Sequence, residues 1–244
     1  MTKKTNENRL PSNHEDDFLG NEYLGVLSQS LKAHSPTLCS IVIDLNSNKY
    51  TTVSNYVLDL VCGRICYSHD KPLFDSVPIE EYKVMVRRSE MTRSFMRSMI
   101  DVEDVASLSI IEDYHVRLNG KDLLVTQKFM PLKVNNEGKI TVGLLLITPS
   151  VNSSFGELMV FWKKRMWRYD ECTSSFVEKE KPCVSESEKR LLLLSISGFS
   201  VKDIALHLSL SENTVKTKRR RLFKKLGVKS LMAAMTKMDC YSLW

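Results

Sequence analysis

The sequence has no apolar run long enough to cross a membrane and no apolar core of a secretory signal near its N-terminus. A membrane-spanning helix needs about 20 consecutive apolar residues, whereas the longest apolar runs, at residues 142–147 and 191–194, are far shorter. Residues 1–16 are mostly polar and are expected to form a disordered tail. These absences predict a cytoplasmic protein that has no membrane partner.

Cysteine pairs of the CxxC type are also missing, although the chain has six cysteines. Cys62 and Cys66 would share one face of a helix, but their spacing is not a zinc motif, so free buried thiols are expected and no metal site. There is no nucleophile elbow, phosphate-binding loop or pair of catalytic acids. The sequence therefore predicts no catalytic residue; an enzyme tethered to DNA by its C-terminal part is an alternative that no motif supports.

The net charge of +6 is concentrated at one end of the chain. Residues 185–244 contain twelve Lys and Arg against five Asp and Glu, while the other 184 residues contain 23 against 24. Such an asymmetry is expected where a terminal module binds a polyanion.

Along residues 17–150, the spacing of apolar residues alternates between the period of a helix and the period of a strand. Amphipathic helices are expected at residues 18–31, 55–62 and 78–99. Strands are expected, in order, at residues 39–45, 49–53, 110–118, 122–134 and 139–148. The turn signal Asn119-Gly120 predicts a hairpin between the third and fourth of these strands. In the longest helix we assign the apolar positions to the core: Tyr82, Val86, Phe95, Met96 and Met99. We assign the arginines to a solvated face: Arg87, Arg88, Arg93 and Arg97.

This order of two strands, helices and three antiparallel strands is typical of an α+β fold. Over residues 36–150 it resembles a PAS domain in order, in length and in the region from Tyr114-His115-Val116 through the Asn-Gly turn. The resemblance implies a sensor or dimerisation module with a pocket for a small-molecule ligand. No cofactor is predicted, because the chain lacks the Asn-Cys-Arg context of flavin photosensors. His115, inside a strand pattern, is interpreted as a hydrogen-bonded structural residue.

Residues 151–182 form an aromatic-rich connector, in which Phe161, Trp162, Trp167 and Tyr169 surround a basic turn. We interpret it as a β-hairpin that packs against the sensor domain; an interdomain or dimer contact is the alternative. Its last residues, EKEKP, are the expected hinge.

Residues 183–244 contain four short helical segments with helix start signals. Ser185 with Glu188, and Ser200 with Asp203, match the capping box, and Ser211 is the expected N-cap of the third helix. The second and third helices are separated by a very short turn, which is typical of the helix-turn-helix motif. In the third helix Val215, Leu222 and Leu226 lie on one side.

The opposite side of the third helix carries candidate DNA contacts. Arg220 is suited to a bidentate pair with guanine, and Lys216, Arg221 and Lys224 to the neutralisation of phosphates. A generic basic surface helix would explain this charge, but not the capped partner helix just upstream.

Residues 184–235 resemble the LuxR-type (GerE-like) family of transcription regulators without a gap. The matching residues are Glu188, Leu192, Gly198, Ile204-Ala205-x-x-Leu208, Ser211-x-x-Thr214-Val215-Lys216 and Lys225-Leu226-Gly227-Val228-x-Ser230. The resemblance implies that Lys216, Thr217 and Arg220 reach base edges or flanking phosphates, and that Thr214 contacts the DNA backbone. It also implies a dimer contact on a fourth helix capped by Ser230, which we assign to Leu231, Ala234, Met235 and Met238.

The chain departs from the family pattern at four positions. Lys218 stands where the family often has His, and Arg219 where a small apolar residue is common, so the base preference is expected to differ. Leu231 and Ala233 replace an Arg and an acidic residue, which favours a more apolar dimer contact. No receiver domain is predicted upstream, so control by a phosphorelay is not expected.

The sequence thus predicts an α+β PAS-like sensor domain at residues 17–150, followed by an all-α four-helix LuxR-type helix-turn-helix domain. The predicted function is sequence-specific regulation of transcription by a homodimer that binds double-stranded DNA, with RNA polymerase as a further partner. A sigma-factor-like promoter-binding protein and a constitutive dimer without a ligand are the alternatives. An acyl-homoserine-lactone pocket is disfavoured, because Trp162 and Trp167 fall too late in the chain.

Overall fold

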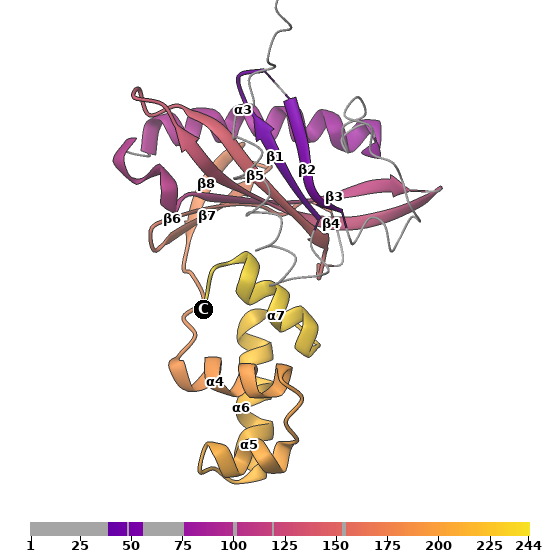
Figure 1. Ribbon diagram of the computed structural model, residues 1–244, viewed down its shortest axis with the longest axis vertical. Helices are drawn as coiled ribbons and strands as arrows, with labels where there is room; N and C mark the ends of the chain where they lie inside the picture. Colours follow the sequence, from indigo (N-terminus) through magenta and orange to yellow (C-terminus); the bar gives the residue numbers. More distant parts are fainter. Residues whose placement is uncertain (1–38, 48, 56–75, 100–101, 119, 153–154) are drawn as a thin grey trace, which may run out of the picture.

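The computed structural model describes residues 39–47, 49–55, 76–99, 102–118, 120–152 and 155–244. A long helix lies across one face of a β-sheet, and four helices form a separate head on the other side of the sheet (Figure 1). The helices expected at residues 18–31 and 55–62, and the Cys62/Cys66 pair, lie outside the described residues. Among the helices that are described, none combines the length and apolar character needed to cross a membrane.

The sheet is antiparallel throughout and has the strand order β2-β1-β5-β4-β3-β6-β7-β8. Its strands are β1 (Cys39–Asp44), β2 (Lys49–Asn55), β3 (Ser109–Leu118), β4 (Lys121–Val134), β5 (Ile140–Pro149), β6 (Leu158–Trp162), β7 (Arg165–Asp170) and β8 (Ser175–Lys179). The first five strands lie where the sequence predicts them and form the expected α+β, PAS-like unit. Gly120 ends the β3–β4 turn with a φ of 76°, a conformation that favours glycine.

Residues 151–182 are not a separate connector. β6 pairs with β3 from Ser109↔Phe161 to Glu112↔Leu158, so β6, β7 and β8 extend the same sheet. The expected hairpin corresponds to β6 and β7, but β8 was not predicted. This edge strand is mostly exposed and therefore lacks the apolar alternation that would identify it. Residues 180–185 connect β8 to the head along the chain.

β6 is buried at all five positions because the sheet is covered on both faces there. Val160 and Trp162 pack with Trp167 in one cluster, which also includes residues of the long helix. Met159 and Phe161 point to the opposite face and join the core of the head. Both interpretations of the aromatic residues are thus partly correct, since they build the sheet domain and its contact with the head.

The long helix, α3 (Ile79–Met99), buries only part of the side that was expected. Phe95 and Met96 pack against the cluster of Trp162 and Trp167, as predicted. Tyr82, Val86 and Met99 are exposed, whereas Met85, Arg88 and Thr92 are buried. The prediction assigned the apolar residues of this helix to the core from helical periodicity alone. In the structure, carboxylates beneath α3 pair with Arg88, so this charged side chain is buried. The prediction of a solvated arginine face is therefore wrong for Arg88, which is 2% exposed.

Arg88 is held by two carboxylates and one carbonyl group. Its Nη1 lies 3.3 Å from Oε1 of Glu112, and its Nε donates to Oε1 of Glu171 at 2.6 Å. Its Nη2 donates to the carbonyl of Gly156 at 3.1 Å. Burial raises the pKa of Glu112 to about 7, although Arg88 acts in the opposite direction.

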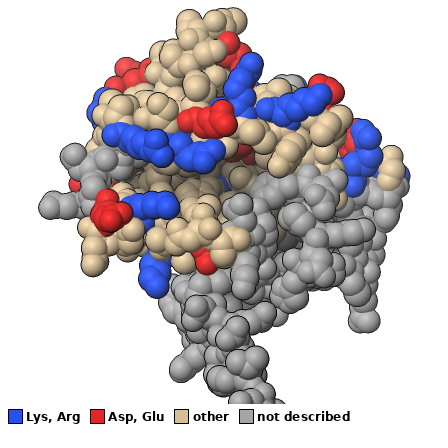
Figure 2. Space-filling view, turned by 90° about the horizontal axis from the view of Figure 1, so that it is seen from above, with Lys and Arg blue, Asp and Glu red and all other residues tan. Residues whose placement is uncertain are grey.

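Acidic and basic side chains alternate on the α3 side of the molecule. Figure 2 shows Lys and Arg beside Asp and Glu on this face, and Arg87 pairs there with Glu171 at 2.7 Å. Basic side chains on this face thus have acidic side chains close to them. His115 has the structural role predicted for it, since its Nδ1 lies 2.7 Å from Oε1 of Glu81 on α3.

The last residues of the chain attach the head to the sheet. Nζ of Lys128, on β4, donates to the carbonyl of Asp239 at 3.0 Å and to Oγ of Ser242 at 2.8 Å. The ring of Tyr241 packs on Phe161 with 5.0 Å between centroids, and its hydroxyl donates to Glu157 at 3.4 Å. We call this contact, made by Lys128, Glu157, Phe161 and Lys181 with residues 239–243, the C-terminal clamp.

The cysteines that the structure describes with their side chains are free, as expected, but not all are buried. Cys172 and Cys183 are exposed, and Cys240 is partly buried beside the C-terminal clamp. Burial raises the pKa of the Cys240 thiol to about 11, so this group stays protonated at neutral pH.

Candidate nucleic-acid interface

The head consists of four helices, and a serine N-cap directly precedes each of them. They are α4 (Glu186–Ile196), α5 (Val201–His207), α6 (Glu212–Leu226) and α7 (Leu231–Cys240). Their N-caps are Ser185, Ser200, Ser211 and Ser230, and each hydroxyl accepts the N–H of the third helical residue. All the predicted caps are confirmed, so the head is defined by local signals that the sequence carries.

The two predicted capping boxes differ in the structure. At α4 the box is complete, since the Glu188 carboxylate also accepts the Ser185 N–H at 2.9 Å. At α5 the Ser200 hydroxyl accepts the Asp203 N–H and donates to the Asp203 carboxylate at 2.6 Å. The Ser185 hydroxyl donates to the Glu188 carboxylate in the same way, at 3.1 Å. The reciprocal bond from the cap backbone N–H is thus confirmed at α4 and stays a prediction at α5.

α6 is fixed in the head by its apolar stripe. Val215 and Leu222 are fully buried and Leu226 nearly so, in one cluster with residues of α4, α5 and α7. Gly227 ends the helix in the left-handed conformation, with a φ of 66°. The turn from α5 is closed by a hydrogen bond from Leu210 N–H to the carbonyl of Ala205 at 2.8 Å. The short turn places α5 and α6 as a helix-turn-helix motif does.

The predicted DNA contacts lie on the exposed part of α6. Lys216, Arg220, Arg221 and Lys224 are exposed, and Thr217 is partly exposed. At 100° per residue, Thr217, Arg220 and Lys224 share the side opposite the apolar stripe, while Lys216 and Arg221 flank that side in opposite directions. The structure thus brings the predicted residues together on one surface.

Thr214 is placed differently from the other candidates. It lies in the first turn of α6, and its hydroxyl is 2.8 Å from the hydroxyl of Ser211. This contact supports the N-cap. A hydroxyl has two lone pairs and one proton, so the expected backbone contact of Thr214 stays a prediction.

The cations of this surface have no acidic partner in the described part of the chain. In the head, the ion pairs of basic side chains are Lys189 with Glu186 and Lys225 with Glu188. The basic turn between β6 and β7 is different, because Lys163 pairs with Asp104 at 2.5 Å and Arg165 with Glu178 at 2.6 Å. Uncompensated positive charge therefore accumulates on α6 and not on that turn.

Two adjacent lysines of α6 have opposite environments. Lys224 is exposed without an ion pair, whereas Nζ of Lys225 lies 2.7 and 2.8 Å from the two carboxylate oxygens of Glu188 and donates to the carbonyl of Cys183 at 3.1 Å. Lys225 therefore ties the end of α6 to the start of α4.

We expect Lys225→Ala to lower the free energy of unfolding by about 1 kcal/mol, since the lost ion pair is partly exposed. Lys224→Ala, which removes the same charge one residue away, should leave stability within about 0.5 kcal/mol of the original. Urea denaturation of both variants checks this. Equal stability of the two variants would contradict the structural role of Lys225.

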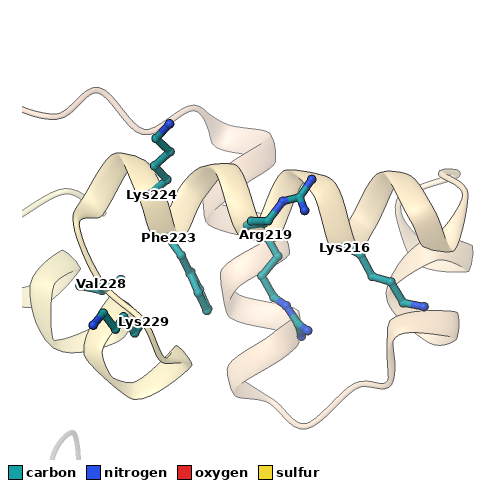
Figure 3. Close-up of a pocket in the computed structure, with 7 residues that line it drawn as sticks. Lys216, Arg219, Phe223, Lys224, Val228 and Lys229 are labelled. Carbon is teal, nitrogen blue, oxygen red and sulfur yellow. The ribbon is translucent and has the colours of Figure 1, made fainter.

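A shallow open groove of about 480 Å³ lies beside the exposed side of α6. It is lined by Lys216, Arg219, Arg220, Phe223, Lys224, Val228 and Lys229. Figure 3 shows Phe223 projecting from α6 toward the segment that carries Val228 and Lys229. The predicted contacts did not include Arg219 and Lys229. The sequence does show the charge of both residues, but only the fold brings the segment after Gly227 against α6.

The predicted dimer contact on α7 is only partly accessible. Ala234 and Met238 are fully buried within the protomer and cannot meet a second copy without disruption of this core. Leu231 and Met235 are partly buried, and Met232, which was not predicted, is 63% exposed. The helical pattern shows that α7 is apolar, but it does not show which apolar residues are buried within the protomer and which stay accessible. A dimer contact through Leu231 and Met235 stays a prediction.

Comparison with known proteins agrees with this geometry at the head. Residues 183–238 match the model of a family described as bacterial regulatory proteins, luxR family. Among solved structures, a phage VqmA–DPO complex is 14% identical, with 89% of this chain and 88% of that chain covered and a TM-score of 0.31. A Vibrio cholerae VqmA dimer without target DNA is also 14% identical, with coverages of 89% and 88% and a TM-score of 0.32. At these scores the overall likeness adds nothing to the contacts described above. A search of curated proteins finds no relative.

Proposed function

Because residues 183–238 form a helix-turn-helix domain of the luxR family of bacterial regulatory proteins, we propose that this protein is a sequence-specific, DNA-binding regulator of transcription. In this proposal α6 enters the major groove of double-stranded DNA. The PAS-like sheet domain receives a signal and controls the head.

One observation carries the proposal: the charge of α6 is uncompensated on a rigidly held surface. A helix that merely keeps the protein soluble would have acidic neighbours, as the α3 face has. α6 is instead capped at both ends and buried along one side, and its other side presents only cations and hydrogen-bonding groups. This arrangement suits an anionic duplex whose base edges must be reached at a fixed position.

We assign Arg220 to base recognition and Lys224 to a phosphate. Arg220 lies on the side opposite the apolar stripe, and its fork of donors fits O6 and N7 of guanine. Lys224 lies one turn further on and offers a single charged point, which suits a phosphate oxygen. Thr217 lies about one turn before Arg220 on the same side, and Lys216 and Arg221 face the two strands.

The sheet domain supports control of the head because the two parts share the C-terminal clamp. A change in the sheet near Lys128 or Phe161 would act directly on the residues that follow α7. The proposal includes a small-molecule ligand in the sheet domain, a homodimer as the DNA-bound form, RNA polymerase as a partner, and action in the cytoplasm. No catalytic role is assigned.

The proposal is tested on duplexes selected by the protein from a random DNA pool. Arg220→Ala should reduce the preference for the selected duplex over a shuffled one by about 1–3 kcal/mol, roughly 5- to 150-fold. Lys224→Ala should weaken binding to both duplexes by a similar factor. Fluorescence anisotropy titrations measure both effects, and Lys133→Ala, an exposed residue near the end of β4, is the control.

If neither α6 variant changes binding relative to the control, the assignment of α6 as the recognition helix is wrong. The sigma-factor-like alternative predicts stable binding to core RNA polymerase, which a pull-down detects. A constitutive regulator predicts that no metabolite raises the melting temperature of the sheet domain, whereas a sensor is stabilised by its ligand.

A further inference from the structure

The groove beside α6 contains charge that base recognition does not use. Arg219 and Lys229 line it together with Lys216, Arg220 and Lys224, and no acidic residue takes part. Neither Arg219 nor Lys229 has an ion pair among the residues that the structure describes. Two cations are thus placed next to three others without local compensation, which costs electrostatic free energy unless an anion binds.

The position of the groove defines which part of a DNA duplex it meets. An α-helix with its side chains is about 10–12 Å across, close to the roughly 12 Å width of the major groove. When the side of α6 that carries Arg220 faces the major groove, side chains about a quarter-turn away therefore face a strand that borders the groove. Phe223 is at this angle, and Arg219 and Lys229 lie on either side of it along the same flank.

The two ends of this flank come from different elements. Arg219 belongs to the middle of α6, and Lys229 follows the left-handed turn at Gly227. The hydrogen bond from Val228 N–H to the carbonyl of Phe223, at 2.9 Å, fixes that turn against the helix. The half-buried Phe223 and Val228 form an apolar floor that holds the cationic groups apart and keeps both of them accessible from one side.

We propose that this groove binds backbone phosphate of the DNA strand that borders α6, with Arg219 and Lys229 as the residues that hold it. The site rests on the proposed function, because it adds a contact with the strand to the same docking of α6. Its contribution is affinity and orientation on the duplex, without base preference.

The test uses the full chain and the salt dependence of its affinity for a selected duplex. Each phosphate contact contributes about 0.9 to the slope of log K against log salt concentration. Arg219→Ala/Lys229→Ala should therefore lower the slope by about 1.8, so that raising NaCl from about 50 to 200 mM costs this variant roughly tenfold less affinity than the original protein loses. The preference over a shuffled duplex should not change.

A charge-matched control is Lys133→Ala/Lys139→Ala, which removes two exposed charges from the sheet domain, one near the end of β4 and one in the turn before β5. This control should leave the slope unchanged, because charges beyond a Debye length of about 10 Å are screened. Arg219→Lys with Lys229 intact should retain the original slope. Circular dichroism and the melting temperature verify that the double variant is folded.

An unchanged slope for Arg219→Ala/Lys229→Ala, while Lys224→Ala lowers the slope by about 0.9, overturns the groove site and leaves the proposed function standing. An unchanged slope for Lys224→Ala and Arg220→Ala as well overturns the proposed function itself. An unchanged slope with a shift in the monomer–dimer equilibrium, measured by sedimentation, would make the groove a contact between copies and also overturn the site.

Discussion

Arg88→Ala is expected to lower the free energy of unfolding of the sheet domain by about 3–5 kcal/mol near pH 8. Arg88 is nearly inaccessible to solvent and neutralises Glu112, which is itself buried in β3. Removal of the guanidinium leaves Glu112 charged in an apolar environment. It also leaves the carbonyl of Gly156 without this donor.

The loss should be smaller near pH 5 than near pH 8. Burial already raises the pKa of Glu112 to about 7, above its usual value of 4.5. Between these values the folded state binds more protons than the unfolded state, so the contribution of Glu112 to stability falls as the pH rises from 4.5 to about 7. Near pH 5 the carboxyl of the variant is protonated, and little uncompensated charge remains.

Urea denaturation monitored by tryptophan fluorescence, at both pH values, measures these effects on Arg88→Ala. Arg93→Ala, on the exposed side of the same helix, is the control and should change stability by less than about 0.5 kcal/mol at either pH. A loss for Arg88→Ala that is equal at the two pH values would show that Glu112 is not the group that Arg88 neutralises. Glu112→Gln in the Arg88→Ala background should recover part of the stability near pH 8.

The head could be predicted from the sequence because its determinants are local. Ser185, Ser200, Ser211 and Ser230 each cap a helix within three residues, and Gly227 ends α6. Each signal acts over one helical turn and needs no knowledge of the rest of the chain. The first five strands were predicted for a similar reason, because their turns and alternation are local.

What the sequence could not supply depends on contacts between distant segments. In the sequence, nothing distinguishes Arg88 from an arginine on an exposed helix face. Its burial depends on Glu112 and Glu171, which the fold brings against it. Met238 looks like a surface residue of an amphipathic helix until the sheet and the other three helices enclose it. The same holds for Lys229, whose association with Arg219 depends on the turn after α6. Tertiary contacts decided these three cases, whereas β8 was missed because it is mostly exposed.

The C-terminal clamp links the sheet domain, proposed to receive the signal, to the head, proposed to bind DNA. Residues 239–243 are contacted by β4, β6 and the segment after β8, so the position of α7 depends on the sheet. α7 in turn packs on α4 and α6. A ligand that altered the sheet would therefore reach the DNA-binding surface through the packed side chains of the C-terminal clamp.

Tyr241→Ala is expected to uncouple the head from the sheet domain, at a cost of about 3–5 kcal/mol, the range for removal of a buried aromatic side chain. Tyr241 is 7% exposed, packs on Phe161 and donates to Glu157. Without this ring the two parts should unfold in separate steps in calorimetry, and the radius of gyration measured by X-ray scattering should increase.

Two further variants separate the contributions to this effect. Tyr241→Phe keeps the ring contact and loses one hydrogen bond, so it should cost only about 0.5–1.5 kcal/mol and preserve a single transition. Met232→Ala, on the exposed side of α7, should change neither stability nor scattering. The buried Ala234 and Met238 keep α7 in the head, so Tyr241→Ala should retain Arg220-dependent DNA binding. A single transition in Tyr241→Ala with unchanged scattering would show that the clamp does not fix the head, and control by the sheet domain would then require another path.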